Sequence, residues 1–371
     1  MTRFPFRAAV LCLGALLLAL PACDSDDPDG DDLGDTSALD EAQANPGQWF
    51  FVETEGAQCR DGSPTGFGVR FQEGSDDLVI YLEGGGACFS PETCSVNPAA
   101  FGEAEFVNPV TGFVATGGNL GLFNADDPSN PIGDWNAVYV PYCTGDVHGG
   151  SAPDALVLGV DGLQQFVGHR NIEAYLALLR PAFADVDEVL LTGSSAGGFG
   201  SLVNFAAVAD AFDGASLTLL DDSGPILFSD AVFTPTLGGA FAQLFNFPAS
   251  FPDDAGALFQ PDGLQGVYAY YDQRYPDATF GLSSYTQDQT IRFFFGFDPL
   301  TGMPFEITGE QFEAALEETA ATIPDSWGTY LAAGADHTFL RFPDRYPGPY
   351  ADWLGELIDG NPADVAVGGT P

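Results

Sequence analysis

The sequence of 371 residues contains no lysine, and its ten basic residues are all arginines. They stand against 53 aspartates and glutamates, so the net charge is −43 at neutral pH. Nucleic-acid binding depends on Lys and Arg side chains that neutralise phosphates, and a surface of this charge repels phosphates instead. The composition therefore excludes nucleic acid as a partner. It is typical of an acid-rich proteome or a saline habitat.

Histidine and cysteine are also scarce. The three histidines, His148, His169 and His337, form no cluster, and the six cysteines form no Cys-x-x-Cys pair, so no metal site is expected. No motif predicts a cofactor.

Four cysteines remain once the two within the first 23 residues are set aside. An even number in an exported protein predicts two disulfides. Cys88 and Cys94 are close enough in sequence to close a small loop, which leaves Cys59 and Cys143 for a longer link.

The N-terminal segment predicts export. Arg3 and Arg7 precede an apolar run that is too short to span a bilayer, so residues 1–22 are predicted to be a lipoprotein signal peptide. The residues up to Cys23 are similar to a bacterial lipobox, which predicts a lipid anchor on Cys23 and a cell-envelope lipoprotein exposed outside the cytoplasm. An ordinary signal peptide cleaved nearby is the alternative. Residues 23–45 are acidic and predict a disordered tether.

Residues 46–371 are expected to form one catalytic domain, because no second linker of that composition follows. A chain with 45% hydrophobic residues can bury a large core. We expect a monomer.

Short apolar runs followed by glycine or polar residues recur along the chain and predict buried strands. An amphipathic helix predicted at 161–180 separates two of them, as a parallel crossover requires. The pattern predicts a mostly parallel, doubly wound α/β sheet. Residues 225–285 are rich in phenylalanine and predict a cap or insertion that roofs the site, although part of this stretch can belong to the core. The predicted strands lie at 78–82, 135–141, 189–191, 217–220 and 330–333.

The most informative stretch is Gly193-Ser194-Ser195-Ala196-Gly197. It follows an apolar run and precedes a helix-compatible segment, which is the context of a Gly-x-Ser-x-Gly nucleophile elbow. Glycines two positions on either side of Ser195 leave room for the tight turn, and the amide of Ala196 points toward the group that Ser195 attacks. The alternative is a glycine-rich turn that only packs a helix on a sheet.

A second glycine run, at Gly84-Gly85-Gly86, follows another predicted strand. Backbone amides at such a position can converge on a developing negative charge. Gly85, Gly86 and Ala196 are therefore the predicted oxyanion hole. A turn without chemical use is the alternative.

A serine nucleophile needs a base and an acid that orients the base. His337 follows the last predicted strand and is the best candidate for the base, because the histidine comes last in this hydrolase order. His148 also lies at a strand end but precedes the serine, and His169 is expected to be structural. For the acid, the residues alone leave Asp221, Asp222 and Asp288 open.

Seven motifs are spread along the chain: YLEGGGAC at 81–88, VPYCTGD at 140–146, FVGHR at 166–170, LTGSSAGG at 191–198, LLDDSG at 219–224, SYTQDQ at 284–289 and ADH at 335–337. Taken together, they resemble the pectin acetylesterase family, which also includes Notum-type carboxylesterases. The similarity runs from about Gly56 to His337. It implies an α/β-hydrolase fold and a Ser-Asp-His triad in which Ser195 is the nucleophile, Asp288 the acid and His337 the base.

The resemblance implies a serine carboxylesterase that hydrolyses O-acetyl or other short acyl esters. We expect the substrate to be an acylated carbohydrate or a small ester rather than pectin itself, since long-range repulsion opposes the approach of a polyanion. Two other interpretations are a Notum-like deacylase of longer fatty-acyl esters and a catalytically silent surface-binding lipoprotein.

Overall fold

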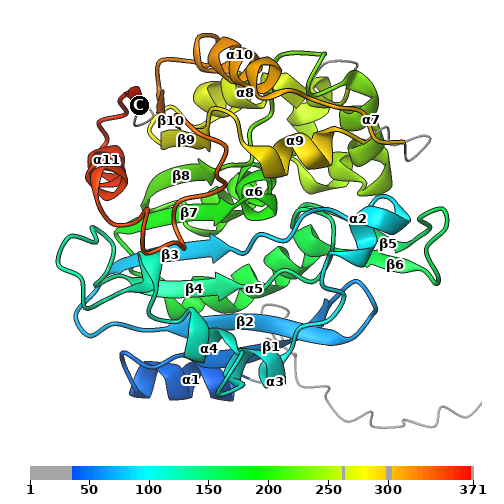
Figure 1. The fold of residues 1–371 in the computed structure, drawn as a ribbon. Coiled ribbons are helices and arrows are strands. Elements are labelled where there is room, and N and C mark those ends of the chain that lie inside the picture. The colour runs from blue at the N-terminus through cyan, green and yellow to red at the C-terminus, as the bar shows by residue number, and fades with distance from the viewer. Residues whose placement is uncertain (1–35, 261–263, 298–302, 369–371) are drawn as a thin grey trace, which may run out of the picture. The chain divides into compact units, whose positions relative to one another are not determined.

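Nine strands form the central sheet in a computed structural model that describes residues 36–260, 264–297 and 303–368. Their spatial order is β1-β2-β4-β3-β7-β8-β9-β10-β11, and the other two strands, β5 and β6, form a separate hairpin (Figure 1). The strands are β1 Phe50–Gln58, β2 Pro64–Arg70, β3 Asp77–Leu82, β4 Asn136–Val140, β5 Ala152–Ala155, β6 Gln164–Phe166, β7 Glu188–Ser194, β8 Ser216–Asp222, β9 Thr279–Tyr285, β10 Trp327–Ala332 and β11 Val365–Val367.

The sheet is mostly parallel. β1 pairs with β2 and β2 with β4 in antiparallel fashion, whereas each neighbouring pair from β4 to β11 is parallel. The carboxyl ends of these seven strands therefore meet at one edge of the sheet, where ligands bind in open α/β folds. The predicted α/β-hydrolase-like fold is confirmed.

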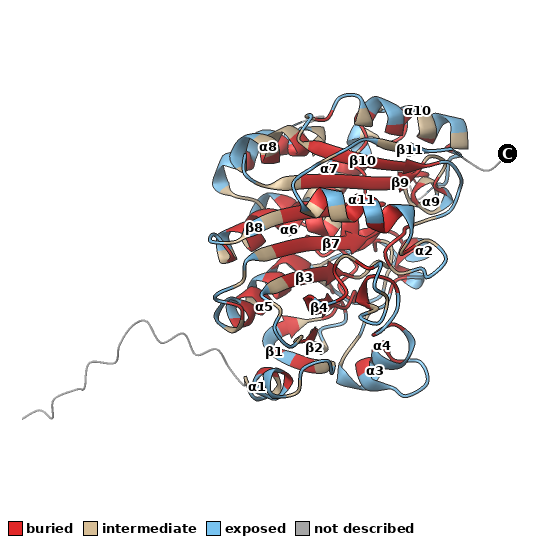
Figure 2. Cartoon of the chain, turned by 90° about the vertical axis from the view of Figure 1, so that its left-hand side faces the viewer, coloured by how far each residue is buried: buried red, intermediate tan, exposed pale blue. Residues whose placement is uncertain are grey.

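Helices cover both faces of the sheet. In β3, Leu78, Ile80 and Leu82 pack with helices α1, α5, α6 and α8, whereas Val79 and Tyr81 pack with α3, α4 and α11. Figure 2 shows the resulting buried layer of strands between the helices. Strands covered on both sides read as continuous apolar runs, which is why five of them were visible in the sequence. The helices are α1 Ser37–Ala44, α2 Pro91–Ser95, α3 Glu103–Val107, α4 Phe113–Thr116, α5 Gly168–Ala182, α6 Ala196–Ala211, α7 Pro235–Leu244, α8 Val267–Arg274, α9 Gln289–Phe295, α10 Gly309–Ala320 and α11 Pro349–Ile358.

The predicted helix at 161–180 is partly wrong. The stretch opens with the short strand β6, and helix α5 begins only at Gly168. The amide of Gly168 donates to the buried carboxylate of Asp146 at 2.7 Å, which holds the start of the helix in place. Leu163, which the helical pattern placed on a buried face, is 53% exposed.

The predicted tether at 23–45 is also too long. Residues 37–44 form helix α1, whose Leu39 and Ala42 are buried in the core beside β1 and β2. These two apolar residues anchor the end of an otherwise acidic segment. Residues 1–35, which comprise the predicted signal peptide, Cys23 and the first part of the predicted tether, lie outside the described residues. Within the described part of the chain, no helix is both long and apolar enough to cross a membrane.

The predicted cap at 225–285 divides into two parts. Its last residues form β9, a central strand of the sheet, and the rest contains α7, α8 and short 3-10 helices. The phenylalanines of α7 and its flanks are mostly buried against one another, as at Phe233, Phe241 and Phe245. Their rings therefore build core rather than a roof of aromatic surface.

Two disulfides link the chain, Cys59–Cys143 across 84 residues and Cys88–Cys94 across 6. A cross-link lowers the entropy of the unfolded chain more when the loop is longer. Replacing Cys59 and Cys143 by alanine is expected to lower the free energy of unfolding by about 4.5 kcal/mol, against about 2 kcal/mol for Cys88 and Cys94. Urea denaturation measures both, and equal losses would contradict this ranking.

Candidate active site

Ser195 occupies a sharp turn between β7 and α6. Its backbone has φ 60° and ψ −117°, a conformation that non-glycine residues rarely adopt and that marks functional sites. A Cβ atom at Gly197 would lie 1.9 Å from the carbonyl oxygen of Leu82, so only glycine lets α6 pass so close to β3. The amide of Ser195 donates to the carbonyl of Asp222 at 2.7 Å, which ties the turn to β8. The local structure is therefore that of a nucleophile elbow.

His337 and Asp288 form a hydrogen-bonded pair. His337 follows β10 and Asp288 follows β9, and 2.6 Å separates Nδ1 of His337 from Oδ2 of Asp288. Because a carboxylate only accepts hydrogen bonds, Nδ1 carries the proton and Nε2 is left to accept one. Asp288 is fully buried, and its other oxygen, Oδ1, caps helix α9 by accepting from the amides of Thr290 and Ile291. The helix thus holds the carboxylate that orients the imidazole.

Ser195 and His337 line the same pocket, whose volume is about 390 Å³. Gly84, Gly85 and Gly86 form part of its wall, and no residue described in 225–285 does. The expectation that this region roofs the site is therefore wrong. No hydrogen bond joins Ser195 to His337 among the described residues, and such contacts often tighten only when substrate binds. The apolar part of the wall includes Val96 beside the aromatic residues Tyr81, Phe294 and Phe342.

Two side chains hold the peptide groups of the glycine run that lines this pocket. Asn97 donates to the carbonyl of Gly85 at 2.8 Å, and Tyr142 donates to the carbonyl of Gly86 at 2.7 Å. In a trans peptide the N–H points away from the C=O, so Asn97 fixes the direction of the Gly86 amide. No described residue accepts a hydrogen bond from the amides of Gly85, Gly86 or Ala196. These three amides therefore lack an acceptor within the described part of the chain, and their role as the oxyanion hole stays a prediction.

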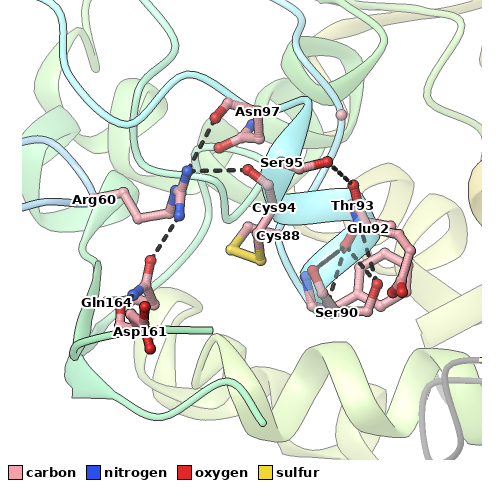
Figure 3. Close-up of a disulfide and its surroundings, with 12 residues drawn as sticks. Arg60, Cys88, Ser90, Glu92, Thr93, Cys94, Ser95, Asn97, Asp161 and Gln164 are labelled. Carbon is pink, nitrogen blue, oxygen red and sulfur yellow. Dashed lines mark hydrogen bonds between the residues drawn. A yellow bond between two sulfur atoms is a disulfide. The ribbon is translucent and has the colours of Figure 1, made fainter. Parts of the chain in front are cut away.

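Asn97 belongs to a polar network around the Cys88–Cys94 disulfide, which Figure 3 shows. Arg60 donates to the side chain of Gln164 at 2.7 Å and to the carbonyl of Asn97 at 2.9 Å. The Cys88–Cys94 disulfide ties the end of the glycine run to helix α2 in the same region. Sequence reasoning missed Arg60, because a lone arginine after a strand carries no local signal.

His148 lies away from the pocket. It is buried, and its Nε2 donates to the carbonyl of Glu83 at 2.8 Å. Burial lowers the pKa of His148 to about 4, so the ring is neutral and supports the residues before the glycine run. His169 lies in α5 and its Nδ1 bonds to Asn204 at 2.7 Å, the structural role expected of it. Among the described residues, no group of three or more His, Cys, Asp or Glu side chains could hold a metal ion.

The lowered pKa of His148 has a measurable consequence. The unfolded chain binds a proton near the ordinary value of 6.5, so the stability that neutral His148 contributes is present above that pH and is lost as pH falls toward 4. The difference in unfolding free energy between wild type and His148→Gln should shift by about 3 kcal/mol in favour of the variant between pH 7 and pH 4. Denaturant titrations at several pH values test this, and a constant difference would contradict it.

Asp222 joins the two halves of the site. Its carboxylate accepts from the hydroxyl of Ser194 at 2.7 Å and from the amides of Phe339 and Leu340 at 3.0 and 3.1 Å. It therefore ties the residue before Ser195 to the loop after His337, and its carboxylate forms no hydrogen bond with His337 itself. Asp221 accepts from the amide of Gly224 and points elsewhere. Of the three candidate acids, only Asp288 bonds to a histidine.

Arg345 stabilises the loop after His337 as well, a role that no sequence motif indicated. Its guanidinium donates to the carbonyl of His337 and, at 2.9 Å, to the carbonyl of Thr338. Thr338 has a positive φ of 58°, so this clamp stabilises a turn that its residue type disfavours.

The elbow, the hydrogen-bonded His337–Asp288 pair and the sheet define a protein of the α/β-hydrolase type. The structure of the Wnt deacylase Notum from Drosophila shares this fold, with a TM-score of 0.63 at 18% identity over 85% of this chain and 95% of that one. The model of the pectinacetylesterase family matches residues 41–247, more than half of the sequence. The chain belongs to the pectinacetylesterase family.

Curated relatives match over part of their length. The palmitoleoyl-protein carboxylesterase notum2 of Xenopus laevis is 33% identical over 163 residues, which are 43% of this chain and 32% of that protein. Pectin acetylesterase 4 of Arabidopsis thaliana is 32% identical over 197 residues, which are 51% of this chain and 46% of that protein. The chain thus aligns with about a third to a half of the length of these relatives.

Proposed function

We propose that the protein is a serine carboxylesterase in which Ser195, His337 and Asp288 act as nucleophile, base and orienting acid. The observation that carries the proposal is the hydrogen bond between His337 and the buried carboxylate of Asp288, with His337 lining the same pocket as Ser195 on its elbow. Family membership and relatives named as carboxylesterases and acetylesterases support the same reaction class.

The chemistry follows from the positions of the donors and acceptors. Nε2 of His337 takes the proton of Ser195 as the hydroxyl oxygen attacks the ester carbonyl, and Asp288 stabilises the imidazolium that results. The amides of Gly85, Gly86 and Ala196 receive the oxyanion, an effect that supplies ~10²–10³ in rate for each donor. His337 then protonates the leaving alcohol. Water hydrolyses the acyl-enzyme by the same route.

The proposed substrates are O-acetyl or other short acyl esters, on a carbohydrate or on a small alcohol. Relatives include both acetylesterases and long-chain deacylases, so acyl length is the property to measure first. Hydrolysis of 4-nitrophenyl acetate should exceed that of the octanoate ester and should depend on Ser195. Absence of serine-dependent turnover on either ester would instead favour a binding protein without catalysis.

Deacylation of longer chains is the second candidate. Val96, Phe294 and Phe342 give the pocket wall an apolar section that suits a fatty-acyl group. A higher kcat/KM for octanoate than for acetate would favour this function.

We further propose that the catalytic domain is exported and tethered to a membrane through a lipid on Cys23. The two disulfides support export, because disulfides form and persist in oxidising compartments. Because α1 belongs to the folded domain, the domain begins near residue 36 rather than 46. Mass spectrometry of the mature N-terminus tests the anchor, and an unmodified terminus would exclude it.

A further inference from the structure

Large apolar side chains are exposed at the entrance of the active-site pocket. Val96, at the end of helix α2, and Phe342, in the loop after His337, are both exposed. Both also line the pocket that holds Ser195, so they lie where the pocket opens to solvent. Single exposed apolar residues are ordinary on a protein surface, whereas a group of them at one place marks an interaction site.

Helix α9 extends this group. Phe294 lines the same pocket, and its ring centre lies 5.3 Å from that of the exposed Phe293. Phe305 is exposed as well, and its amide donates to the carbonyl of Gly296 at the end of α9 at 2.7 Å. Helices α2 and α9 lie close together in both views of the fold (Figure 1 and Figure 2). We call the following four residues the apolar rim: Val96, Phe293, Phe305 and Phe342.

The rim is too small to hold a second protein by itself. Its three phenylalanines are 41% to 52% exposed. At ~200 Å² for a whole aromatic side chain, they present roughly 300 Å² together, whereas a stable contact between two proteins buries ~800 Å² on each partner. A lipid surface needs no matching shape, and its attraction for a protein grows with whatever apolar area enters it. The size of the rim therefore favours a lipid surface over a second copy of the chain.

The charge of the chain decides which lipid surface fits. A net charge of −43 without any lysine repels a bilayer of anionic lipids, which is attracted by clusters of basic residues. The arginines next to the rim are already engaged, since Arg292 donates to the carbonyl of Ile307 and Arg345 to that of Thr338. A surface without net charge exerts no such repulsion. It is the partner that the rim and the charge allow together.

We propose that the apolar rim docks on a lipid surface without net charge, so that Ser195 acts on short acyl esters carried by that surface. The rim contacts the lipids around the ester, whereas the pocket receives the ester itself. The proposal rests on the esterase function above and adds the partner at which it acts. The lipid anchor proposed for Cys23 agrees with it, because residues 24–35 reach at most about 40 Å and keep the domain near a membrane.

The first experiment uses tripropionin, an uncharged triester that forms an emulsion above its solubility limit. The chain from Asp24 to Pro371 keeps all three core clusters and lacks Cys23, so no anchor contributes to its binding. Its rate should rise by about fivefold or more when the ester concentration passes the solubility limit. A rate that only saturates, with no rise at that limit, would overturn the proposal.

The Phe293→Ser, Phe305→Ser double variant removes half of the rim. Neither residue belongs to the described wall of the pocket, so kcat/KM for dissolved 4-nitrophenyl acetate should stay within about twofold. The rise at the solubility limit should be lost. Val110→Ser is the matched control, because Val110 is an exposed apolar residue between α3 and α4, and this variant should keep the rise. Thermal unfolding checks that both variants are folded, and a rise retained in the double variant would contradict the proposal.

Vesicle binding separates docking from the esterase function. Ser195→Ala in the same chain should float with phosphatidylcholine vesicles, and adding Phe293→Ser and Phe305→Ser should weaken this binding by roughly tenfold or more. Vesicles of phosphatidylglycerol should bind less, because they are anionic. Binding without hydrolysis by wild type would contradict the esterase function and leave docking in place, whereas hydrolysis without binding would overturn docking. A wild-type dimer that the double variant abolishes in sedimentation would show that a second copy covers the rim, and would overturn it too.

Discussion

Replacing Ser195 by alanine is expected to lower kcat/KM for 4-nitrophenyl acetate by roughly 10⁴- to 10⁶-fold while leaving the fold intact. The change removes the attacking oxygen, and the hydroxyl forms no hydrogen bond with a described residue whose loss would destabilise the chain. The residual rate should come from the amides of Gly85, Gly86 and Ala196. Steady-state kinetics beside thermal unfolding measure both quantities.

The adjacent serine provides the control. Ser194 is also buried, but its hydroxyl donates to Asp222. Ser194→Ala should lower stability by about 1 kcal/mol and reduce kcat/KM by about tenfold or less, because Asp222 keeps the amides of Phe339 and Leu340. A larger loss of activity in Ser194→Ala than in Ser195→Ala would mean that Ser194, and not Ser195, is the nucleophile.

Asp288→Asn is expected to lower kcat by roughly 10³- to 10⁴-fold with little loss of stability. Asparagine caps a helix as well as aspartate does, so the amides of Thr290 and Ile291 keep their acceptor. The amide group of asparagine, however, donates to Nδ1 of His337, which moves the imidazole proton to Nε2. That tautomer cannot accept the proton of Ser195.

Asp222→Asn is the matched variant for this prediction. It should lower stability more than Asp288→Asn does and lower kcat less. Its carboxylate accepts from the two amides after His337 and from the hydroxyl of Ser194. An asparagine nitrogen would face one of these donors, at a cost of about 1–3 kcal/mol in unfolding free energy. Its loss of kcat should be smaller than that of Asp288→Asn. The opposite ranking in kcat would make Asp222 the catalytic acid.

The sequence made the parallel core of the sheet predictable because its strands are apolar on both faces. β9 was missed for a physical reason. Its sequence, TFGLSSY, contains a glycine and two buried serines, and such residues are not typical of the apolar runs that predict buried strands. Gly281 leaves space for Leu357, and Ser283 bonds to the hydroxyl of Tyr350 at 2.9 Å. These long-range partners decide its burial, and no local pattern reveals them.

The missed strand also explains why the residues alone left the acid open. Without β9, Asp288 had no strand end to follow, whereas Asp221 and Asp222 visibly followed the strand predicted at 217–220, which the structure extends to Asp222 as β8. The family resemblance selected Asp288, and the geometry joins it to His337. The supporting residues Arg60 and Arg345 act through backbone carbonyls. Such contacts depend on the folded chain and leave no motif.

Covalent labelling tests the central claim most directly. A fluorophosphonate reacts with an activated serine, and peptide mass spectrometry then locates the adduct. We predict one phosphonyl group on Ser195, no adduct on Ser195→Ala and much slower labelling of His337→Ala. Labelling of Ser194 or another residue would contradict the assignment of the nucleophile. If an excess of reagent left Ser195 unlabelled and hydrolysis continued at full rate, that result would also contradict the assignment.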